Sequence, residues 1–146
     1  MKRIAVIGAG FMGSGIAQVC AQAGHAVTLI DLTEERLGFA RNAIAWSLDK
    51  LENKEQLDAP ASVVADRIQT STGYSAARDA ELVIEAVYED RETKRNAIRT
   101  LDGICRSDAI IGSNTSTIPI TQLAAASRHP ERVIGIHFFG PVPLMR

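Results

Sequence analysis

His137 is the residue of this sequence best suited to moving a proton. It lies near the end of an apolar run, RVIGIHFF (residues 132–139), and two prolines follow it within six residues. An imidazole group, with an unperturbed pKa of ~6.5, can take a proton from a hydroxyl group near neutral pH, as hydride transfer from an alcohol requires. The alternative is a structural histidine at the end of a strand. His25 and His129 have simpler explanations, because they lie beside a helix-ending glycine and in a polar loop.

The motif GAGFMG (residues 8–13) has the spacing of a phosphate-binding turn. Gly8 permits a tight turn, Gly10 lets a pyrophosphate approach the backbone, and Gly13 lets a helix pack on a strand. The start of that helix offers free N–H groups and the positive end of a dipole. We therefore expect the whole turn to contact a dinucleotide, including the intervening residues Ala9, Phe11 and Met12.

Asp31 ends the next apolar segment, eighteen residues after Gly13. A carboxylate in this place accepts hydrogen bonds from both ribose hydroxyl groups of the adenosine and repels a 2′-phosphate. Leu32 and Thr33, which follow, supply no arginine for such a phosphate. These residues predict NAD rather than NADP. The alternative is that Asp31 caps a helix that begins near Thr33.

Polar residues also follow two later apolar segments. Glu89 and Lys94 come after ELVIEAV (residues 81–87), and SNTST (residues 113–117) ends the segment beyond. The Glu–Lys pair would otherwise be a solvated pair at a helix start, and the Ser/Thr cluster a helix cap. Because the carboxyl ends of parallel strands meet at one edge, we expect all these groups to gather with His137.

Alternating apolar segments and helical patterns must position these groups. We expect strands at 2–8, 26–31, 67–72, 81–87, 109–114 and 132–139. Apolar residues at helical spacing follow most of them, with Gly24 ending the first helix, Pro60 opening a short one, and 118–127 forming the last. Strands of this kind separated by helices predict a Rossmann-type α/β fold, a doubly wound parallel sheet in one domain.

Composition narrows the class of protein. The chain has 146 residues, 46% of them apolar and 23% charged, with a net charge of −1. This is typical of a soluble globular domain and favours neither a nucleic-acid nor a membrane partner. Cys20 and Cys105 lie in apolar helical patterns without metal-ligand spacing, so we expect no metal, buried thiols and a cytoplasmic location. The start MKRIAVIG resembles a signal peptide, but cleavage would remove the first strand and the glycine turn.

Four segments together resemble the NAD-binding domain of the 3-hydroxyacyl-CoA dehydrogenases: GAGFMGSGIAQ, VIEAVYED with the lysine that follows, SNTSTIPIT and HFFGPVPLMR. The resemblance covers essentially the whole chain. It implies NAD-dependent, reversible oxidation of 3-hydroxyacyl-CoA to 3-ketoacyl-CoA, in fatty-acid β-oxidation or a related pathway. It also implies an acyl-CoA partner.

The same resemblance implies roles for individual residues. His137 would be the catalytic base, and Ser116 would hydrogen-bond the reacting oxygen of the substrate. Asp31 would hold the ribose. The remaining cofactor contacts would come from Glu89, Lys94, Asn114, Ser116 and Gly140, where the family usually has Asn in place of Gly140. Ser47 and Lys54 match positions that meet the CoA moiety.

The family pattern extends beyond Arg146. It includes a glutamate that pairs with the base, and a helical second domain that completes the acyl-CoA cleft and forms homodimers. We therefore expect residues 1–146 to be the cofactor-binding part of such an enzyme. One rival is an NAD-binding module without turnover. The 3-hydroxyisobutyrate and 6-phosphogluconate dehydrogenases share the glycine turn, but they lack the HFFxPVPLM segment and use a lysine for acid–base chemistry.

Overall fold

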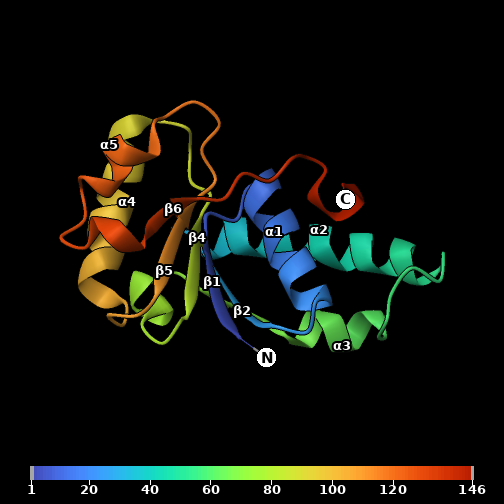
Figure 1. Ribbon diagram of the computed structural model, residues 1–146. Coiled ribbons are helices and arrows are strands. Elements are labelled where there is room, and N and C mark those ends of the chain that lie inside the picture. The colour runs from blue at the N-terminus through green and yellow to red at the C-terminus, as the bar shows by residue number, and fades with distance from the viewer. Residues whose placement is uncertain (1, 146) are drawn as a thin grey trace.

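A computed structural model describes residues 2–145, and its centre is one six-stranded sheet (Figure 1). The strands are β1 (Arg3–Ile7), β2 (Ala26–Ile30), β3 (Ile68–Ser71), β4 (Leu82–Glu85), β5 (Ile110–Ser113) and β6 (Val133–Gly135). They lie in the order β3-β2-β1-β4-β5-β6, and each neighbouring pair is parallel. The doubly wound parallel sheet predicted from the sequence is confirmed.

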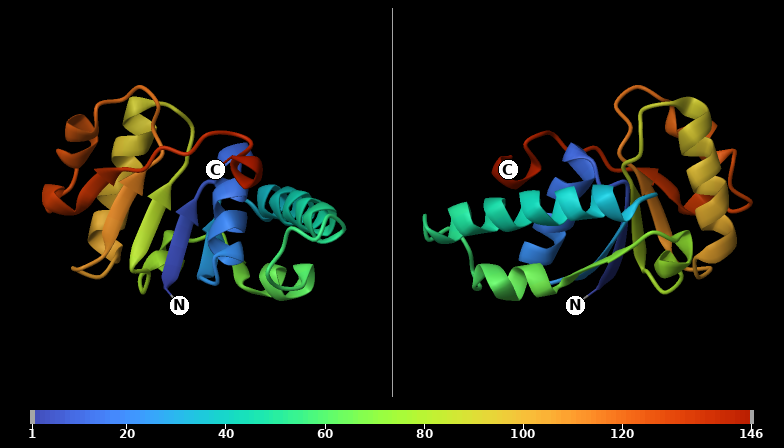
Figure 2. Two further views of the ribbon diagram at one scale, coloured as in Figure 1. Left: turned by 45° about the vertical axis from the view of Figure 1, so that its right-hand side comes forward. Right: turned by 180° about the vertical axis from the view of Figure 1, so that it is seen from behind.

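Helices cover both faces of the sheet (Figure 2). They are α1 (Phe11–Gln22), α2 (Glu34–Glu52), α3 (Ala61–Asp66), α4 (Arg91–Ile104) and α5 (Ile120–Ala124), with 3-10 turns η1 (Tyr74–Ala77), η2 (Pro130–Arg132) and η3 (Val142–Leu144). The first three helices lie on one face, and α4 and α5 lie on the other. None of the helices within residues 2–145 has both the length and the hydropathy needed to cross a bilayer.

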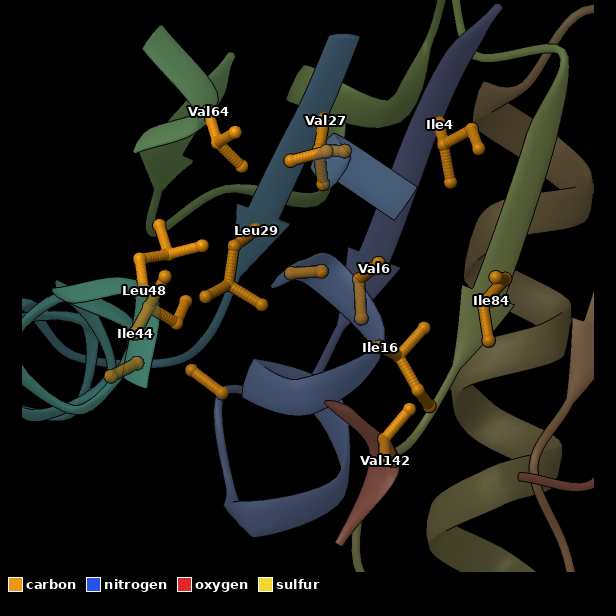
Figure 3. Close-up of a cluster of buried hydrophobic side chains, with 14 of the residues drawn as sticks. Ile4, Val6, Ile16, Val27, Leu29, Ile44, Leu48, Val64, Ile84 and Val142 are labelled. Atoms are coloured by element: carbon orange, nitrogen blue, oxygen red, sulfur yellow. The ribbon is translucent and has the colours of Figure 1, made fainter. Parts of the chain in front are cut away.

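Alternation along the strands divides the core into two clusters. In β1, Ile4 and Val6 face the cluster under α1, whereas Ala5 and Ile7 face the cluster under α4. Figure 3 shows the first cluster, in which Val6 lies close to Ile16 of α1. Full burial of an aliphatic side chain is worth about 1.5–3 kcal/mol, so burial on both faces contributes much of the free energy that holds β1 at the centre of the sheet.

The ends of the helices follow the signals in the sequence. Thr33 caps α2 by accepting a hydrogen bond from the Arg36 amide (3.3 Å). Gly24, just beyond α1, has φ +85°, a conformation that favours glycine, and Pro60 immediately precedes α3. These predicted helix boundaries are confirmed.

The last strand and the last helix are shorter than predicted. The strand expected over 132–139 ends at Gly135, and the helix expected over 118–127 spans only Ile120–Ala124. After Gly135, one more amide, that of Ile136, reaches the β5 carbonyl of Ser113 (3.0 Å). The chain then leaves the sheet, because the next backbone bond goes from Phe138 to a side chain.

The C-terminal segment, residues 136–145, crosses the carboxyl edge of the sheet and returns to α1 (Figure 1). Val142 is 5% exposed and belongs to the first core cluster. It packs where α1 carries Gly15, at which an added Cβ would lie 2.9 Å from the Val142 Cβ. The close approach of this segment therefore favours glycine at position 15, because a larger residue would push Val142 away from α1.

A buried ionic cluster joins α4 to the connection that precedes β6. The carboxylate of Asp102 accepts hydrogen bonds from Ser127 Oγ (2.6 Å), the Arg128 amide (3.0 Å) and Arg132 Nη2 (2.8 Å). The side chains of Asp102 and Arg132 are only 3% and 7% exposed. Burial opposes ionisation of Asp102, but these donors outweigh it and hold the pKa of the carboxyl well below its ordinary value.

We predict that Asp102→Asn lowers the free energy of unfolding by about 2 kcal/mol at pH 7, because hydrogen bonds to a buried charge are lost. A carboxyl with a lowered folded-state pKa stabilises the fold above its unfolded pKa of about 3.9 and loses that contribution as the pH falls. Urea unfolding at pH 7 and at pH 3 should therefore show that the free energy of unfolding falls less for the variant than for the wild type. Asp108→Asn, in an exposed ion pair with Arg106, is the control and should change little. Equal pH dependence in Asp102→Asn and wild type would contradict the prediction.

Candidate functional site

The turn between β1 and α1 leaves room for a ligand beside exposed backbone. Gly8 has φ +100°, and an added Cβ there would lie 2.6 Å from the Ala86 carbonyl oxygen. Around Gly10, in contrast, an added Cβ would meet no atom within 4 Å. Gly10 precedes α1 without a side-chain cap, and the first amide bonded back to it is that of Ser14 (2.9 Å). The earlier amides of α1 can therefore bind an anion.

Asp31 lies at the end of β2 and is bonded to this turn. One carboxylate oxygen accepts from the Ala9 amide (2.6 Å) and the other from the Leu32 amide (2.6 Å). Asp31 does not cap α2, because Thr33 does so. The expectation that no arginine lies nearby is wrong, since Arg36 Nη1 is 3.5 Å from the carboxylate. Each oxygen retains a lone pair for a ribose hydroxyl.

Glu89 lies beyond β4 and binds the polar loop beyond β5. Its Oε1 accepts hydrogen bonds from the Ser116 amide (3.1 Å), the Thr117 amide (3.3 Å) and the Thr115 hydroxyl. Burial works against the charge of Glu89, but the Thr115 hydrogen bond and the Lys94 ammonium lower its pKa below the ordinary value. The carboxylate is therefore ionised near neutral pH and holds this loop in place.

Lys94 lies in the first turn of α4 and is buried between two carboxylates. Its side chain is 1% exposed, and its ammonium lies 2.7 Å from Glu85 and 3.3 Å from Glu89. The Val87 carbonyl also accepts a hydrogen bond from the ammonium (3.2 Å). Lys94 thus makes two hydrogen bonds, to Glu85 and to Val87, and an ion pair with Glu89. The expected cofactor contact of Lys94 stays a prediction.

His137 and Ser116 meet at the carboxyl edge of the sheet. The Nε2 atom of His137 is 3.0 Å from Ser116 Oγ, and both residues are exposed. The imidazole also lies against Phe139, with ring centroids 4.6 Å apart. A hydroxyl beside an exposed imidazole can share the oxygen of a bound substrate while the ring takes up or returns a proton.

Asn114 fixes the segment that carries His137. Its side-chain carbonyl accepts a hydrogen bond from the Phe138 amide (2.8 Å), and the residue is 8% exposed. Asn114 thus holds the chain as it leaves β6, and its expected cofactor contact stays a prediction.

Comparison with known proteins gives this geometry a family. The model of the 3-hydroxyacyl-CoA dehydrogenase NAD binding domain matches residues 3–146. The chain belongs to the 3-hydroxyacyl-CoA dehydrogenase family. It corresponds to the NAD-binding domain, which confirms the resemblance and the cofactor predicted from the sequence.

Relatives in the 3-hydroxyacyl-CoA dehydrogenase family are about twice as long. A probable 3-hydroxybutyryl-CoA dehydrogenase of Deinococcus radiodurans is 45% identical over 145 residues, 99% of this chain and 52% of that protein. The mitochondrial hydroxyacyl-coenzyme A dehydrogenase of Sus scrofa is 39% identical over 153 residues, 100% of this chain and 49% of that protein. The crystal structure of (S)-3-hydroxybutyryl-CoA dehydrogenase from Ralstonia eutropha has a TM-score of 0.95 and 40% identity, covering 99% of this chain and 52% of that one. The chain thus spans about half the length of the curated relatives it matches.

Gly140 lies beside the start of α1. An added Cβ at Gly140 would lie 2.7 Å from the Phe11 ring and 3.3 Å from Met12 Sδ. Phe11, 72% exposed, therefore occupies the space beside this position. A larger residue would require the Phe11 ring to move.

The two residues matched to the CoA-binding positions of the family lie together in a groove. Ser47 and Lys54 of α2 line a space of about 650 Å³ between α1 and α2. Its other walls include Phe11, Phe39 and Leu144. The groove starts at the glycine turn and is mostly apolar, with lysines on one side. The CoA contact of Ser47 and Lys54 stays a prediction.

Sequence reasoning missed two charged residues near the site. Glu85, fully buried at the end of β4, binds Lys94 and also accepts from Ser113 Oγ (2.5 Å). A carboxylate inside an apolar strand was a signal for it, because buried charges are paired. Arg36 gave no such signal, since an arginine in the first turn of a helix is an ordinary surface residue.

Proposed function

We propose that this domain serves an NAD-dependent dehydrogenase that interconverts 3-hydroxyacyl-CoA and 3-ketoacyl-CoA. The observation that supports it best is the 3.0 Å contact between Ser116 Oγ and His137 Nε2, at the same sheet edge as the glycine turn. The relatives named above include a probable 3-hydroxybutyryl-CoA dehydrogenase and an (S)-3-hydroxybutyryl-CoA dehydrogenase. The alternative, an NAD-binding module without catalytic turnover, would not need an exposed imidazole beside an exposed hydroxyl.

The residues of the chain fit the cofactor. The open space at Gly10 and the uncapped start of α1 suit a pyrophosphate, and Asp31 suits the adenosine ribose. The chemistry that NAD supplies when bound is the acceptance of a hydride from the alcohol carbon. The residues of the domain bind the cofactor, orient the substrate and transfer the proton.

The proton moves through His137. In oxidation, Nε2 takes the proton of the substrate hydroxyl while the hydride leaves the same carbon. In reduction, the imidazolium gives that proton back to the keto oxygen. The hydroxyl of Ser116, held 3.0 Å from the ring, donates a hydrogen bond to the same oxygen and stabilises the charge that develops on it.

The cofactor preference is testable at Asp31 and Arg36. We expect NAD to bind more tightly than NADP, because the Asp31 carboxylate would repel a 2′-phosphate. Asp31→Ala should lower the ratio of the NADP dissociation constant to the NAD dissociation constant by about tenfold, which is about 1.4 kcal/mol. Part of that change should come from Arg36, which loses its carboxylate partner and becomes free to bind the phosphate.

Fluorescence titration with NADH and NADPH would measure both affinities. The double variant Asp31→Ala/Arg36→Ala should lose the gain in NADPH affinity, and Arg41→Ala, on the same helix, is the matched control. Equal affinity of the wild type for NADH and NADPH would refute the role of Asp31.

The proposed activity is tested with two proteins. The 146-residue chain should bind NADH but show little turnover of acetoacetyl-CoA. A protein with this domain and a second half like that of its relatives should reach a rate of roughly 1–10³ per second. Absence of turnover in the longer protein, with NADH binding intact, would favour the non-catalytic module.

A further inference from the structure

Lys94 and Glu85 form a charge pair that is shut off from solvent. Their side chains are 1% and 0% exposed, and Nζ lies 2.7 Å from Glu85 Oε1. Glu85 also accepts from the Val87 amide (2.8 Å) and, through Oε2, from Ser113 Oγ (2.5 Å). The pair thus joins the end of β4, the end of β5 and the first turn of α4.

The stability of the fold does not by itself explain why a buried charge pair is present here. Removing two charges from water costs several kcal/mol, and a buried ion pair often stabilises a fold no more than apolar residues of the same volume. Here one ammonium serves two carboxylates, Glu85 and Glu89. The remaining negative charge belongs to Glu89, whose side chain is 38% exposed.

The two oxygens of Glu89 have separate partners. Oε2 faces Lys94 at 3.3 Å, whereas Oε1 accepts the bonds from Thr115, Ser116 and Thr117. Because Lys94 holds one oxygen, the carboxylate cannot rotate away from the loop without losing an ionic contact. The ammonium thereby sets the orientation of the carboxylate that carries the Ser116 amide.

The chain of contacts continues to the proton-transfer group. The Ser116 amide is 3.1 Å from Glu89 Oε1, and the hydroxyl of the same residue is 3.0 Å from His137 Nε2. We propose that Lys94, fixed by Glu85, is a positioning residue that holds Glu89 against the Ser116 loop and so places the Ser116 hydroxyl at His137. This proposal rests on the proposed function only for its effect on turnover.

Amide exchange tests the positioning without any reaction. In the 146-residue chain, Lys94→Met keeps an apolar stem and removes the ammonium, and Glu85→Gln changes less volume. Hydrogen exchange followed by NMR should show the Ser116 and Thr117 amides exchanging at least about tenfold faster in both variants, because their acceptor is no longer held. The NADH affinity of Glu85→Gln should stay within about twofold, since Glu85 is fully buried and is not among the expected cofactor contacts.

Asp102→Asn is the matched control, because it breaks the other buried ionic cluster without touching the loop. It should lower global stability yet leave exchange at Ser116 and Thr117 unchanged once stability is matched with urea. If Lys94→Met and Glu85→Gln raise the exchange rates of the Ser116 and Thr117 amides no more than Asp102→Asn does, the proposal is overturned. A large loss of NADH affinity with unchanged exchange would also overturn it, and would give Lys94 a direct cofactor contact.

Turnover provides the second readout. In the longer protein with its second half, Lys94→Met and Glu85→Gln should each lower kcat for acetoacetyl-CoA reduction by about 10–100-fold. Glu85→Gln should leave KM for NADH nearly unchanged, because a misplaced group costs rate rather than binding. An unchanged kcat would overturn the link from Lys94 to His137. If the wild type itself shows no turnover, the proposed function fails, while the exchange result still decides whether Lys94 positions the loop.

Discussion

Replacing His137 with glutamine is expected to lower kcat by about 10²–10⁴-fold, the contribution typical of general acid–base catalysis. Glutamine keeps a polar side chain near Ser116 but cannot take up and release a proton in the working pH range. NADH affinity should be nearly unchanged, because the glycine turn and Asp31 lie on other strands. The residue would then act in the reaction and not in cofactor binding.

Steady-state kinetics of the longer protein in both directions would measure this effect. The rate of oxidation should fall as the imidazole becomes protonated, and the rate of reduction should fall as it loses its proton. His129→Gln is the control, since His129 is exposed and precedes the opposite end of β6. Near-normal kcat in His137→Gln would mean that the base is elsewhere and that His137 is structural.

Gly13→Ala should destabilise the domain by about 3 kcal/mol or more, the upper range for overpacking. An added Cβ at Gly13 would overlap the carbonyl oxygen of Gly8, which is backbone and cannot turn aside as a side chain can. Relief requires α1 to move away from β1, which would also open the turn that faces the pyrophosphate. We therefore expect the loss of stability and of NADH affinity to occur together.

Gly38→Ala is the control for this substitution. Gly38 lies inside α2, where an added Cβ would meet no atom within 4 Å. Alanine there should stabilise the domain by up to about 1 kcal/mol, because it is the better helix former. Urea unfolding and NADH titration of both variants would measure the contrast. Equal stability of Gly13→Ala and wild type would show that the α1–β1 contact adapts without cost.

Much of the fold could be predicted from the sequence because local pattern and tertiary role agree. In β1, apolar residues at every position from Ile4 to Ile7 indicate a strand covered on both sides, and the structure buries Ile4 and Ala5 in different clusters. Gly8, Gly10 and Gly13 predict a turn between strand and helix, which the structure has. The predictions held where one segment carried both the strand pattern and the turn chemistry.

Predictions that depended on three-dimensional packing were less successful. The run through Phe139 looks like strand by composition, yet pairing with β5 ends just after Gly135 and Asn114 takes the next amide. A lysine in the first turn of a helix looks solvated, but the fold places Glu85 and Glu89 around Lys94. Neither outcome has a local signal, because each depends on where a residue from another strand arrives.

The C-terminal segment has a consequence for how this domain is made. Val142 completes a core cluster whose other members, Ile16 among them, leave the ribosome much earlier. Until Val142 is made, the surface of α1 beside Gly15 is uncovered, and the bond to Asn114 that fixes the His137 segment requires the Phe138 amide. Domains generally fold as units during synthesis. The core under α1 is therefore complete only once Val142 has been made, so the placement of His137 belongs to the later steps in the assembly of this domain.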